Sequence, residues 1–281
     1  MRWFFFQTLK RLVPLFVLLL PPVAQALEIH GEWQQGAMVQ GRVPPDTQVE
    51  FLGRKVRVAD DGLFVVGLGR DAAETAVLVT VSAEGRREHR FPVTQRQYRI
   101  QRIEGVPART VNPNPEQVKR SREEAAMAWR ARQTESSRRD FARDFRWPLI
   151  GPVTGVYGSQ RVYNGEPRRP HYGVDVAAPT GTVVRAPAAG VVTLAHKEMF
   201  FSGGTLIVDH GHGVSSSFIH LSKILVEEGQ EITQGQPIAE VGATGRATGP
   251  HLDWRMNWFN QRLDPALLVG PMPDTASAAG Q

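Results

Sequence analysis

The stretch that decides the fold is GPHLDWRMNW, residues 249–258, near the C-terminal end of the chain. If this stretch is a β-strand, alternate side chains point to opposite faces. One face then carries large apolar side chains: Leu252, Trp254, Met256 and Trp258. The other face carries polar and charged side chains: His251, Asp253, Arg255 and Asn257. The sequence therefore predicts a strand with one buried face and one face that bears a polar site.

A second polar stretch, HYGVD at residues 171–175, supplies another histidine and another carboxylate. Pro170, Gly173 and Pro179 disfavour a helix here, so we expect an extended segment that keeps residues 171 and 175 on one side. More histidines lie between the two stretches, at positions 210, 212 and 220. Imidazole and carboxylate groups suit a divalent metal such as Zn²⁺, and a catalytic zinc ion needs three such ligands and an open position. The sequence therefore predicts a catalytic metal site.

Several ordered motifs in residues 147–269 are shared with a known family. They are WPL at 147–149, HYGVD at 171–175, APAAGVV at 186–192, VDHG at 208–211, FIHLS at 218–222 and GQPI at 235–238. In these motifs the segment resembles the lysostaphin-type zinc endopeptidases, the LytM-like peptidases of family M23. The resemblance implies a mainly β chain whose C-terminal domain, residues 147–269, is an antiparallel β-sheet peptidase domain of the barrel-sandwich hybrid type.

The resemblance also implies a set of metal ligands. His171 and Asp175 match two zinc ligands of the family, and the third ligand position falls on Asp253. The family usually has the second histidine of an H-x-H motif there, but aspartate also ligates zinc through oxygen. We therefore expect a Zn²⁺ cofactor held by these three residues. Arg255 is expected on the same strand face, where it supports the site or pairs with Asp253 and leaves the metal two protein ligands.

Two further histidines, His220 and His251, match the family's catalytic residues beside the metal-bound water. Such residues orient the water and stabilise or protonate a tetrahedral intermediate, and the sequence leaves open which histidine does which. His210 matches a common family position and is expected to support the site rather than to bind metal. The alternative is a decayed site, as in relatives that keep the fold and bind and activate a cell-wall amidase.

Residues 1–26 have the features of a secretory signal peptide. Basic residues precede an apolar run over 12–20, and Ala24-Gln25-Ala26 is a typical cleavage site. The run is short for a membrane span of about 20 residues, which disfavours an uncleaved anchor. The sequence therefore predicts secretion to the periplasm or cell envelope. The chain has no cysteine, which excludes disulfides and thiolate metal ligands.

Residues 27–103 are predicted to form a small β-sandwich of immunoglobulin-like type. Short β-prone runs at 39–43, 48–52, 55–58, 63–67, 76–81 and 87–93 alternate with turn residues. No group of side chains in this part of the sequence suits catalysis.

Residues 104–146 are predicted to be a basic linker that contains a helix, with Asn114 as N-cap and Pro115 in the first turn. A thin apolar stripe is expected from Val118, Ala125, Trp129, Phe141 and Phe145. Residues 86–146 hold sixteen Lys or Arg and eight Asp or Glu, a net charge of +8. The helix is expected to be a solvated linker or a basic face for an anionic surface, such as lipid head groups or cell-wall carboxylates. An exported chain is not expected to bind nucleic acid.

In the C-terminal half, strands are predicted at 182–185, 190–195, 205–209, 215–220, 237–241 and 251–257, and residues 270–281 are expected to be a disordered tail. With the resemblance, these features predict an exported zinc endopeptidase that hydrolyses peptide bonds of peptidoglycan. The alternative is a catalytically inactive regulator that binds a cell-wall protein partner.

Overall fold

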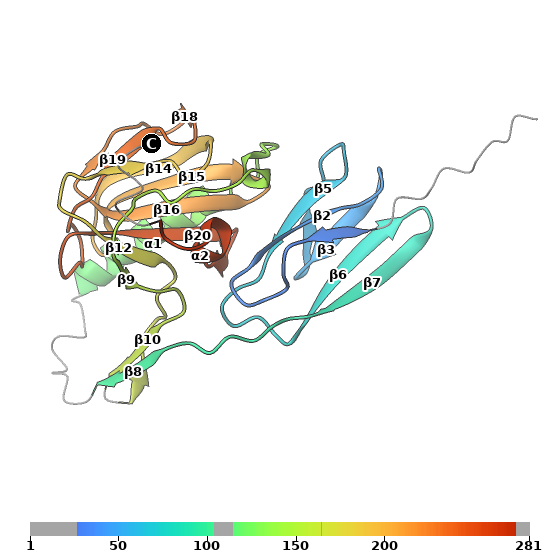
Figure 1. The fold of residues 1–281 in the computed structure, drawn as a ribbon, viewed down its shortest axis with the longest axis horizontal. Helices are drawn as coiled ribbons and strands as arrows, with labels where there is room; N and C mark the ends of the chain where they lie inside the picture. The colour runs from blue at the N-terminus through green and yellow to red at the C-terminus, as the bar shows by residue number, and fades with distance from the viewer. Residues whose placement is uncertain (1–26, 104–114, 164, 274–281) are drawn as a thin grey trace, which may run out of the picture.

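The structure is a computed structural model that describes residues 27–103, 115–163 and 165–273. Figure 1 shows two β-rich parts side by side, an N-terminal part in blue and cyan and a C-terminal part in yellow to red. The predicted signal peptide, residues 104–114 of the predicted linker and residues 274–281 of the predicted tail lie outside the described residues. In the described part, no helix is long and apolar enough to cross a membrane.

The N-terminal part consists of two antiparallel sheets. One has the order β1-β2-β5 and the other the order β4-β3-β6-β7. The strands are β1 (Glu28–His30), β2 (Met38–Arg42), β3 (Gln48–Phe51), β4 (Arg54–Val56), β5 (Leu63–Gly67), β6 (Thr75–Ser82) and β7 (Gly85–Pro92). All six predicted runs are strands, because turn residues bound each of them. The immunoglobulin-like type of this part stays a prediction.

The C-terminal part is built on one large sheet with the order β18-β14-β15-β16-β20-β12-β9, with β21 paired to β20. Its strands are β9 (Val153–Gly155), β12 (Val174–Ala177), β14 (Gly190–Met199), β15 (Gly203–Gly211), β16 (Val214–Leu221), β18 (Glu231–Ile232), β20 (His251–Trp258) and β21 (Gln261–Leu263). A short helix, α2 (Ala266–Val269), follows.

Two smaller sheets complete the C-terminal part. The first has the order β13-β19-β17, from β13 (Val183–Arg185), β19 (Pro237–Glu240) and β17 (Lys223–Ile224). The second has the order β11-β10-β8, from β11 (Glu166–Pro167), β10 (Gln160–Tyr163) and β8 (Ile100–Ile103). All six predicted C-terminal strands are present, and the mainly β fold is confirmed. The short strands β9, β10 and β11 were not predicted, because each is only two to four residues long. Strand β12 begins within the extended segment expected at residues 171–175.

Strand β20 has the two faces that its sequence predicts. Its apolar face is at most 2% exposed at Leu252, Trp254, Met256 and Trp258. Trp254 lies opposite Phe218 of β16 and Val174 of β12, so this face belongs to the apolar core. The other face carries Asp253, which lies opposite Asp175 of β12 and Ile219 of β16.

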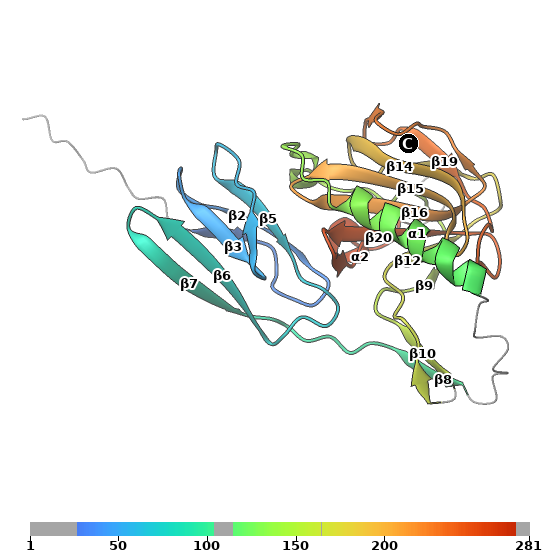
Figure 2. The ribbon, with the colours of Figure 1, turned by 180° about the vertical axis from the view of Figure 1, so that it is seen from behind.

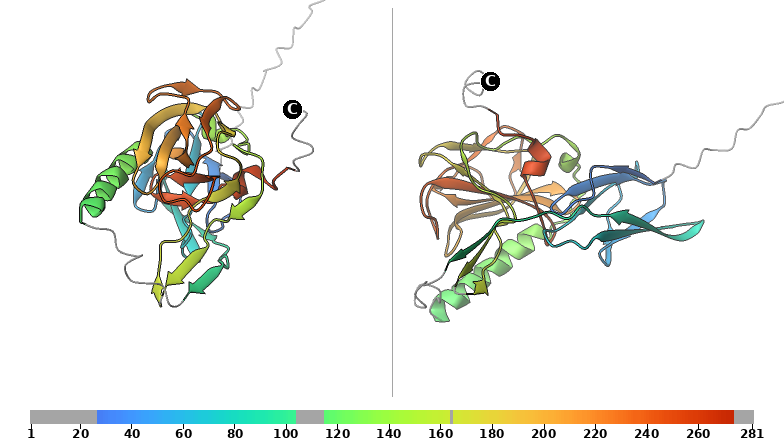
Figure 3. Two further views of the ribbon diagram at one scale, coloured as in Figure 1. Left: turned by 90° about the vertical axis from the view of Figure 1, so that its left-hand side faces the viewer. Right: turned by 60° about the horizontal axis from the view of Figure 1, so that its bottom comes forward.

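Helix α1 (Pro115–Arg132) lies across the large sheet, as Figure 2 and the left view of Figure 3 show. Its residues Met127, Ala128 and Ala131 pack against Leu194 and Ile207. Directly opposed residues of neighbouring strands point to the same face, and one such row contains Ile207, Ser217 and Arg255. Helix α1 therefore covers the face of the sheet that carries Asp253.

The predicted apolar stripe of α1 is wrong. Ala125 is exposed, and Trp129 is 48% exposed. Met127, Ala128 and Ala131 make the contact instead. Residues after the helix also pack on the sheet: the fully buried Phe141 lies against His212, and Phe145 lies edge-on to His210. The prediction that these two phenylalanines are apolar contacts is confirmed.

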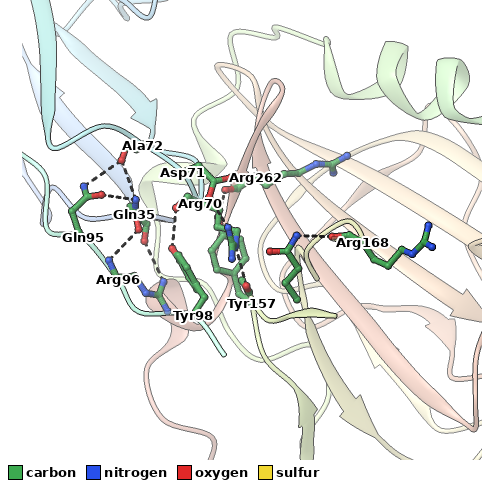
Figure 4. A network of polar contacts seen from close by, with 12 residues as sticks. Gln35, Arg70, Asp71, Ala72, Gln95, Arg96, Tyr98, Tyr157, Arg168 and Arg262 are labelled. Carbon is green, nitrogen blue, oxygen red and sulfur yellow. Dashed lines mark hydrogen bonds and ion pairs between the residues drawn. The ribbon is translucent and has the colours of Figure 1, made fainter. Parts of the chain in front are cut away.

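The N-terminal and C-terminal parts are joined by specific contacts. Figure 4 shows the polar network at this junction, in which Arg96 and Tyr98 follow the N-terminal sheets and meet residues of the C-terminal part. The Arg96 guanidinium pairs with Asp264 at 2.8 Å, and the Tyr157 hydroxyl donates to the Arg262 carbonyl at 2.6 Å. The rings of Phe51 and Trp258 lie 5.9 Å apart. The junction therefore reaches the end of β20, the strand that carries the candidate site.

Candidate metal centre

Three predicted ligands come together at the start of β12 and of β20. One ligand atom from each of His171, Asp175 and Asp253 lies within 4.8 Å of the other two. The His171 backbone is fixed by two hydrogen bonds of 2.8 Å, one to the Ser159 carbonyl and one from the Gly158 amide. The two aspartates are direct cross-strand neighbours, so their carboxylates project from the same face.

Steric crowding explains why the H-x-G-x-D motif has a glycine at its third position. A methyl group at Gly173 would collide with the Asp253 carboxylate and with the Arg255 side chain. A methyl group at Gly155, on the neighbouring strand β9, would collide with the Asp175 carboxylate. Both glycines therefore let neighbouring backbones approach the carboxylates closely.

Two buried polar atoms in this group have no hydrogen-bond partner among the residues that the structure describes. They are His171 Nε2 and Asp175 Oδ1, which lie 3.2 Å apart without forming a hydrogen bond. A buried polar atom without a partner costs about 1–3 kcal/mol. Imidazole nitrogen and carboxylate oxygen are ligands that Zn²⁺ accepts, and a cation between them would satisfy both atoms. The residues present therefore fit a divalent metal ion.

Asp253 is paired with Arg255. Arg255 donates from Nε to Asp253 Oδ1 at 2.9 Å and from its terminal nitrogen to Oδ2 at 2.5 Å. Burial would raise the pKa of the Asp253 carboxyl, but the charge and hydrogen bonds of Arg255 lower it on balance. A carboxylate has about four lone-pair positions and Arg255 uses two of them, so the pair leaves Asp253 able to bind a metal. Asp253 Oδ2 also lies 3.9 Å from His171 Nδ1.

His220 and His251 lie beside the three ligands, with ring centroids 4.9 Å apart. Their Nδ1 atoms lie 2.8 Å from backbone carbonyls, of Thr244 and of Gly249 respectively. A carbonyl only accepts, so each Nδ1 carries the proton and each neutral ring keeps a lone pair on Nε2. His251 Nε2 lies 3.8 Å from Asp175 Oδ1. Burial lowers the pKa of His220, which favours this neutral form.

The backbone of His220 adopts a positive φ of 65°. A histidine in this left-handed region is uncommon, and such conformations gather at functional sites. The conformation is held in place by the backbone hydrogen bond of 2.8 Å from His220 to the Ser202 carbonyl.

His210 lies apart from these residues. Its Nδ1 and Nε2 each form a hydrogen bond of 2.6 Å, to the Ala189 carbonyl and to the Ser216 hydroxyl. Ser216 lies opposite Met256, so this histidine belongs to the core face of the sheet and not to the metal-site face. Burial lowers its pKa to about 4. Its two hydrogen bonds lead to the core rather than to the ligands, and the expected supporting role of His210 stays a prediction.

Two arginines near Arg255 were not predicted from the sequence. Arg132 comes from the last turn of α1 and Arg262 from β21. The ring of Tyr172 lies 5.7 Å from the Arg262 guanidinium. Because Tyr172 lies inside the HYGVD motif, the sequence could have indicated that this residue is near the site, but it gives no such signal for the two arginines. The two arginines reach this place only through the packing of α1 and the β20–β21 hairpin.

The part of the chain that contains these residues is similar to known proteins. The sequence model of peptidase family M23 matches residues 169–265, which contain all five predicted ligand and catalytic residues. The peptidoglycan DD-endopeptidase ShyA of Vibrio cholerae is 39% identical over 102 residues, which are 33% of this chain and 24% of ShyA. The DD-carboxypeptidase/endopeptidase Mpg of Neisseria meningitidis is 38% identical over 110 residues, 39% of this chain and 25% of Mpg. The chain thus spans about a quarter of the length of these curated relatives.

One solved structure covers nearly the whole chain. It is a crystal structure from Pseudomonas aeruginosa assigned to peptidase M23, with 32% sequence identity and a TM-score of 0.67. The similarity covers 85% of this chain and 96% of that protein, so it extends well beyond the matched family segment. From this coverage and from the matched family segment, the chain belongs to peptidase family M23.

Proposed function

We propose that the chain is an exported, Zn²⁺-dependent endopeptidase that hydrolyses peptide bonds in the stem peptides or cross-links of peptidoglycan. The observation that carries this proposal is the pair of buried, unbonded atoms His171 Nε2 and Asp175 Oδ1, which face each other beside Asp253. The names of the curated relatives support peptidoglycan as the substrate.

In this proposal His171, Asp175 and Asp253 hold the metal. When bound, a zinc ion supplies Lewis-acid polarisation of the scissile carbonyl and activation of water. Proton transfer is carried out by side chains of the protein. In their neutral forms His220 and His251 carry the proton on Nδ1, so each can accept a proton on Nε2 and return it to the leaving amine. Their bonds to the Thr244 and Gly249 carbonyls fix both rings in this orientation.

The pairing of Asp253 with Arg255 makes an aspartate electrostatically suitable at the third ligand position. One carboxylate and one guanidinium together carry no net charge. The ligand set of His171, Asp175 and the Asp253–Arg255 pair therefore carries a single negative charge. This is the charge that two neutral histidines and one aspartate would supply. Arg255 is thus proposed as a positioning residue that keeps both the orientation of Asp253 and the charge of the centre.

The same pair is also what favours the alternative function. If Arg255 held Asp253 away from a metal, the chain would keep two protein ligands and act as a regulator of a cell-wall amidase. The unbonded atoms of His171 and Asp175 and the oriented histidines argue for the enzyme, because a decayed site has no need of unsatisfied buried ligands.

Export and surface contacts complete the proposal. Cleavage after Ala26 would release a chain of the periplasm or cell envelope, which N-terminal sequencing of the secreted protein would test. Helix α1 keeps Lys119 and Arg122 exposed, so its outer face could contact an anionic surface such as cell-wall carboxylates.

The test is digestion of purified peptidoglycan by the full mature chain, residues 27–281, loaded with zinc. We expect cross-linked muropeptides to decrease and monomers to increase, as measured by mass spectrometry. Chelation should abolish digestion and added zinc should restore it. A zinc-loaded chain that leaves all cross-links and stem peptides intact would contradict the proposed function and support the regulator.

A further inference from the structure

Arg132, Arg255 and Arg262 form an arginine cluster next to the metal centre, and they come from three different elements. Burial, together with the neighbouring guanidinium groups, lowers the pKa of Arg132 to about 10 and that of Arg262 to about 9. Arg255 is paired with Asp253. Within the described ranges, neither Arg132 nor Arg262 forms an ion pair with a carboxylate. The cluster therefore has two positive charges without a paired counter-charge.

Several buried polar atoms around this cluster also lack a hydrogen-bond partner among the described residues. They are Arg132 Nε, Ser215 Oγ, Ser217 Oγ and Asn257 Nδ2. All four can donate a hydrogen bond. The Asn257 amide is oriented by Arg262, which donates to its Oδ1 at 2.7 Å and leaves Nδ2 free.

The register of the sheet brings these donors together. Ser217 lies opposite Arg255, and Ser215 lies opposite Asn257. Free donors and an excess of positive charge at one place are complementary to an anion.

We propose that Arg132, Arg262, Ser217 and Asn257 bind a carboxylate of the substrate peptide; this inference rests on the proposed function. Arg132 comes from helix α1, which covers the metal-site face, and Ser217 and Arg262 lie opposite Arg255 and Asn257 of β20. These two β20 positions are two and four residues from Asp253. At about 3.3 Å per residue, that is about 7–13 Å, the length of two to four residues of an extended peptide. Guanidinium groups match the planar shape of a carboxylate, and a peptide offers one at its C-terminus and on each acidic side chain.

The proposal assigns helix α1 a part in substrate binding. Arg132 is its last residue, and the neighbouring Gln133 donates to Asn260 Oδ1 at 3.0 Å, beside the β20–β21 hairpin. Docking of α1 partly buries the unpaired Arg132 charge against the sheet, which is unfavourable until an anion is bound. A substrate carboxylate therefore stabilises the docked helix, and the docked helix completes the binding site. Figure 4 shows that Arg262 joins the junction network through its backbone while its side chain extends away from that network.

The experiment compares two cross-linked muropeptides that differ only in one stem group, a free carboxylate or a carboxamide. With the zinc-loaded full mature chain, we expect kcat/KM to favour the carboxylate form by at least about tenfold, the contribution of one charge-assisted hydrogen bond. Arg132→Met and Arg262→Met should each bring this preference close to one. Arg130→Met is the matched control, since it removes the same charge from an exposed position on the same helix turn and should keep the preference.

Two further measurements distinguish anion binding from a purely structural role of the arginines. In the absence of substrate, Arg132→Met should leave the Tm unchanged or raise it, because an unpaired, partly buried charge is removed. A lower Tm, with equal losses on both muropeptides, would assign the arginines a purely structural role and overturn the proposal. If the wild-type chain cleaves neither muropeptide, the proposed function is contradicted. Calorimetry of the binding of the same two compounds then tests whether the anion site exists. Tighter binding of the carboxylate form would support it, and equal binding would overturn it.

Discussion

Two groups that each contain a histidine differ in how completely their polar atoms are bonded. We call His171, Asp175 and Asp253 the open cluster, and His210 with its hydrogen-bond partners Ala189 and Ser216 the closed cluster. In the closed cluster both imidazole nitrogens are hydrogen-bonded. In the open cluster, His171 Nε2 and Asp175 Oδ1 are buried without a partner in the described part of the chain.

This difference distinguishes a candidate metal site from a histidine that only stabilises the fold. Bonded groups such as those of the closed cluster stabilise the fold and have no remaining capacity to bind a metal. The open cluster keeps ligand atoms available at a cost in stability. In these two groups, the unsatisfied atoms are the candidate ligands and the satisfied atoms belong to the core.

The largest expected effect comes from removing a ligand of the open cluster. His171→Ala should lower zinc affinity by more than about a hundredfold and abolish peptidoglycan digestion, because a direct ligand is lost. The stability of the metal-free protein should change by less than about 1 kcal/mol, since the removed Nε2 has no hydrogen bond to lose. Metal content after dialysis and thermal unfolding measure the two effects. Full zinc occupancy in this variant would mean that His171 is not a zinc ligand and would contradict the assignment of the open cluster as the metal site.

The opposite pattern is expected from the closed cluster. His210→Ala should lower the free energy of unfolding by about 3–4 kcal/mol, because it leaves a cavity and deprives the Ala189 carbonyl and the Ser216 hydroxyl of their partner. Zinc affinity should stay within about threefold of wild type, because His210 is not a ligand. Urea unfolding measures the free energy of unfolding, and competition with a chelator measures the zinc affinity. A loss of zinc without a loss of stability would move His210 into the functional site.

The closed cluster should also give the folded protein a pH dependence. Burial lowers the pKa of His210 from 6.5 to about 4, while the nearby Asp140 and Arg138 act in opposite directions. Between these two values the unfolded chain binds a proton that the folded chain does not. The stability contributed by neutral His210 is therefore complete above pH 6.5 and is lost as the pH falls toward 4, by about 3 kcal/mol.

The measurement is the difference in urea stability between wild type and His210→Gln from about pH 4 to about pH 7. Glutamine does not titrate, so the difference isolates the histidine. A difference that stays constant over this range would show that the ring is not held in its neutral form.

The smallest effect tests the charge balance at the open cluster. Asp253→His alone leaves the Arg255 charge unpaired beside the metal, whereas the double change Asp253→His with Arg255→Met removes it. We expect the single variant to bind zinc about tenfold more weakly than the double variant, as measured by chelator competition. Arg255→Met in the wild-type background is the control and should not weaken zinc binding through charge. Equal affinities of the single and double variants would mean that Arg255 does not influence the metal.

The sequence predicts those parts of the fold and of the site that a local pattern determines. Alternation along β20 predicts its buried face at Leu252 and Trp254, because strand geometry alone determines which side chains share a face. The spacing of the H-x-G-x-D motif places His171 and Asp175 together, and Arg255 was recognised as a partner for Asp253 because the two are separated by one residue on a strand.

Long-range packing determines what the sequence could not predict. Helix α1 has no strong apolar face, so Trp129 was expected inside and lies outside, while Ala131 makes the contact. The position of Arg132 follows from this docking, and that of Arg262 from the β20–β21 hairpin. Residues distant in the sequence also determine whether the ring nitrogens of a histidine are hydrogen-bonded. Ala189 and Ser216 bond both ring nitrogens of His210, and nothing in the sequence around residue 210 indicates this.

Binding of one metal ion by His171, Asp175 and Asp253 is tested most directly by X-ray absorption at the zinc edge of the zinc-loaded full mature chain. The geometry of the open cluster predicts one zinc ion per chain with a single imidazole ligand and the remaining ligands oxygen. Scattering from two or more imidazoles would contradict it, because it would mean that His220 or His251 has replaced Asp253 as a ligand and that the Asp253–Arg255 pair stands outside the metal site.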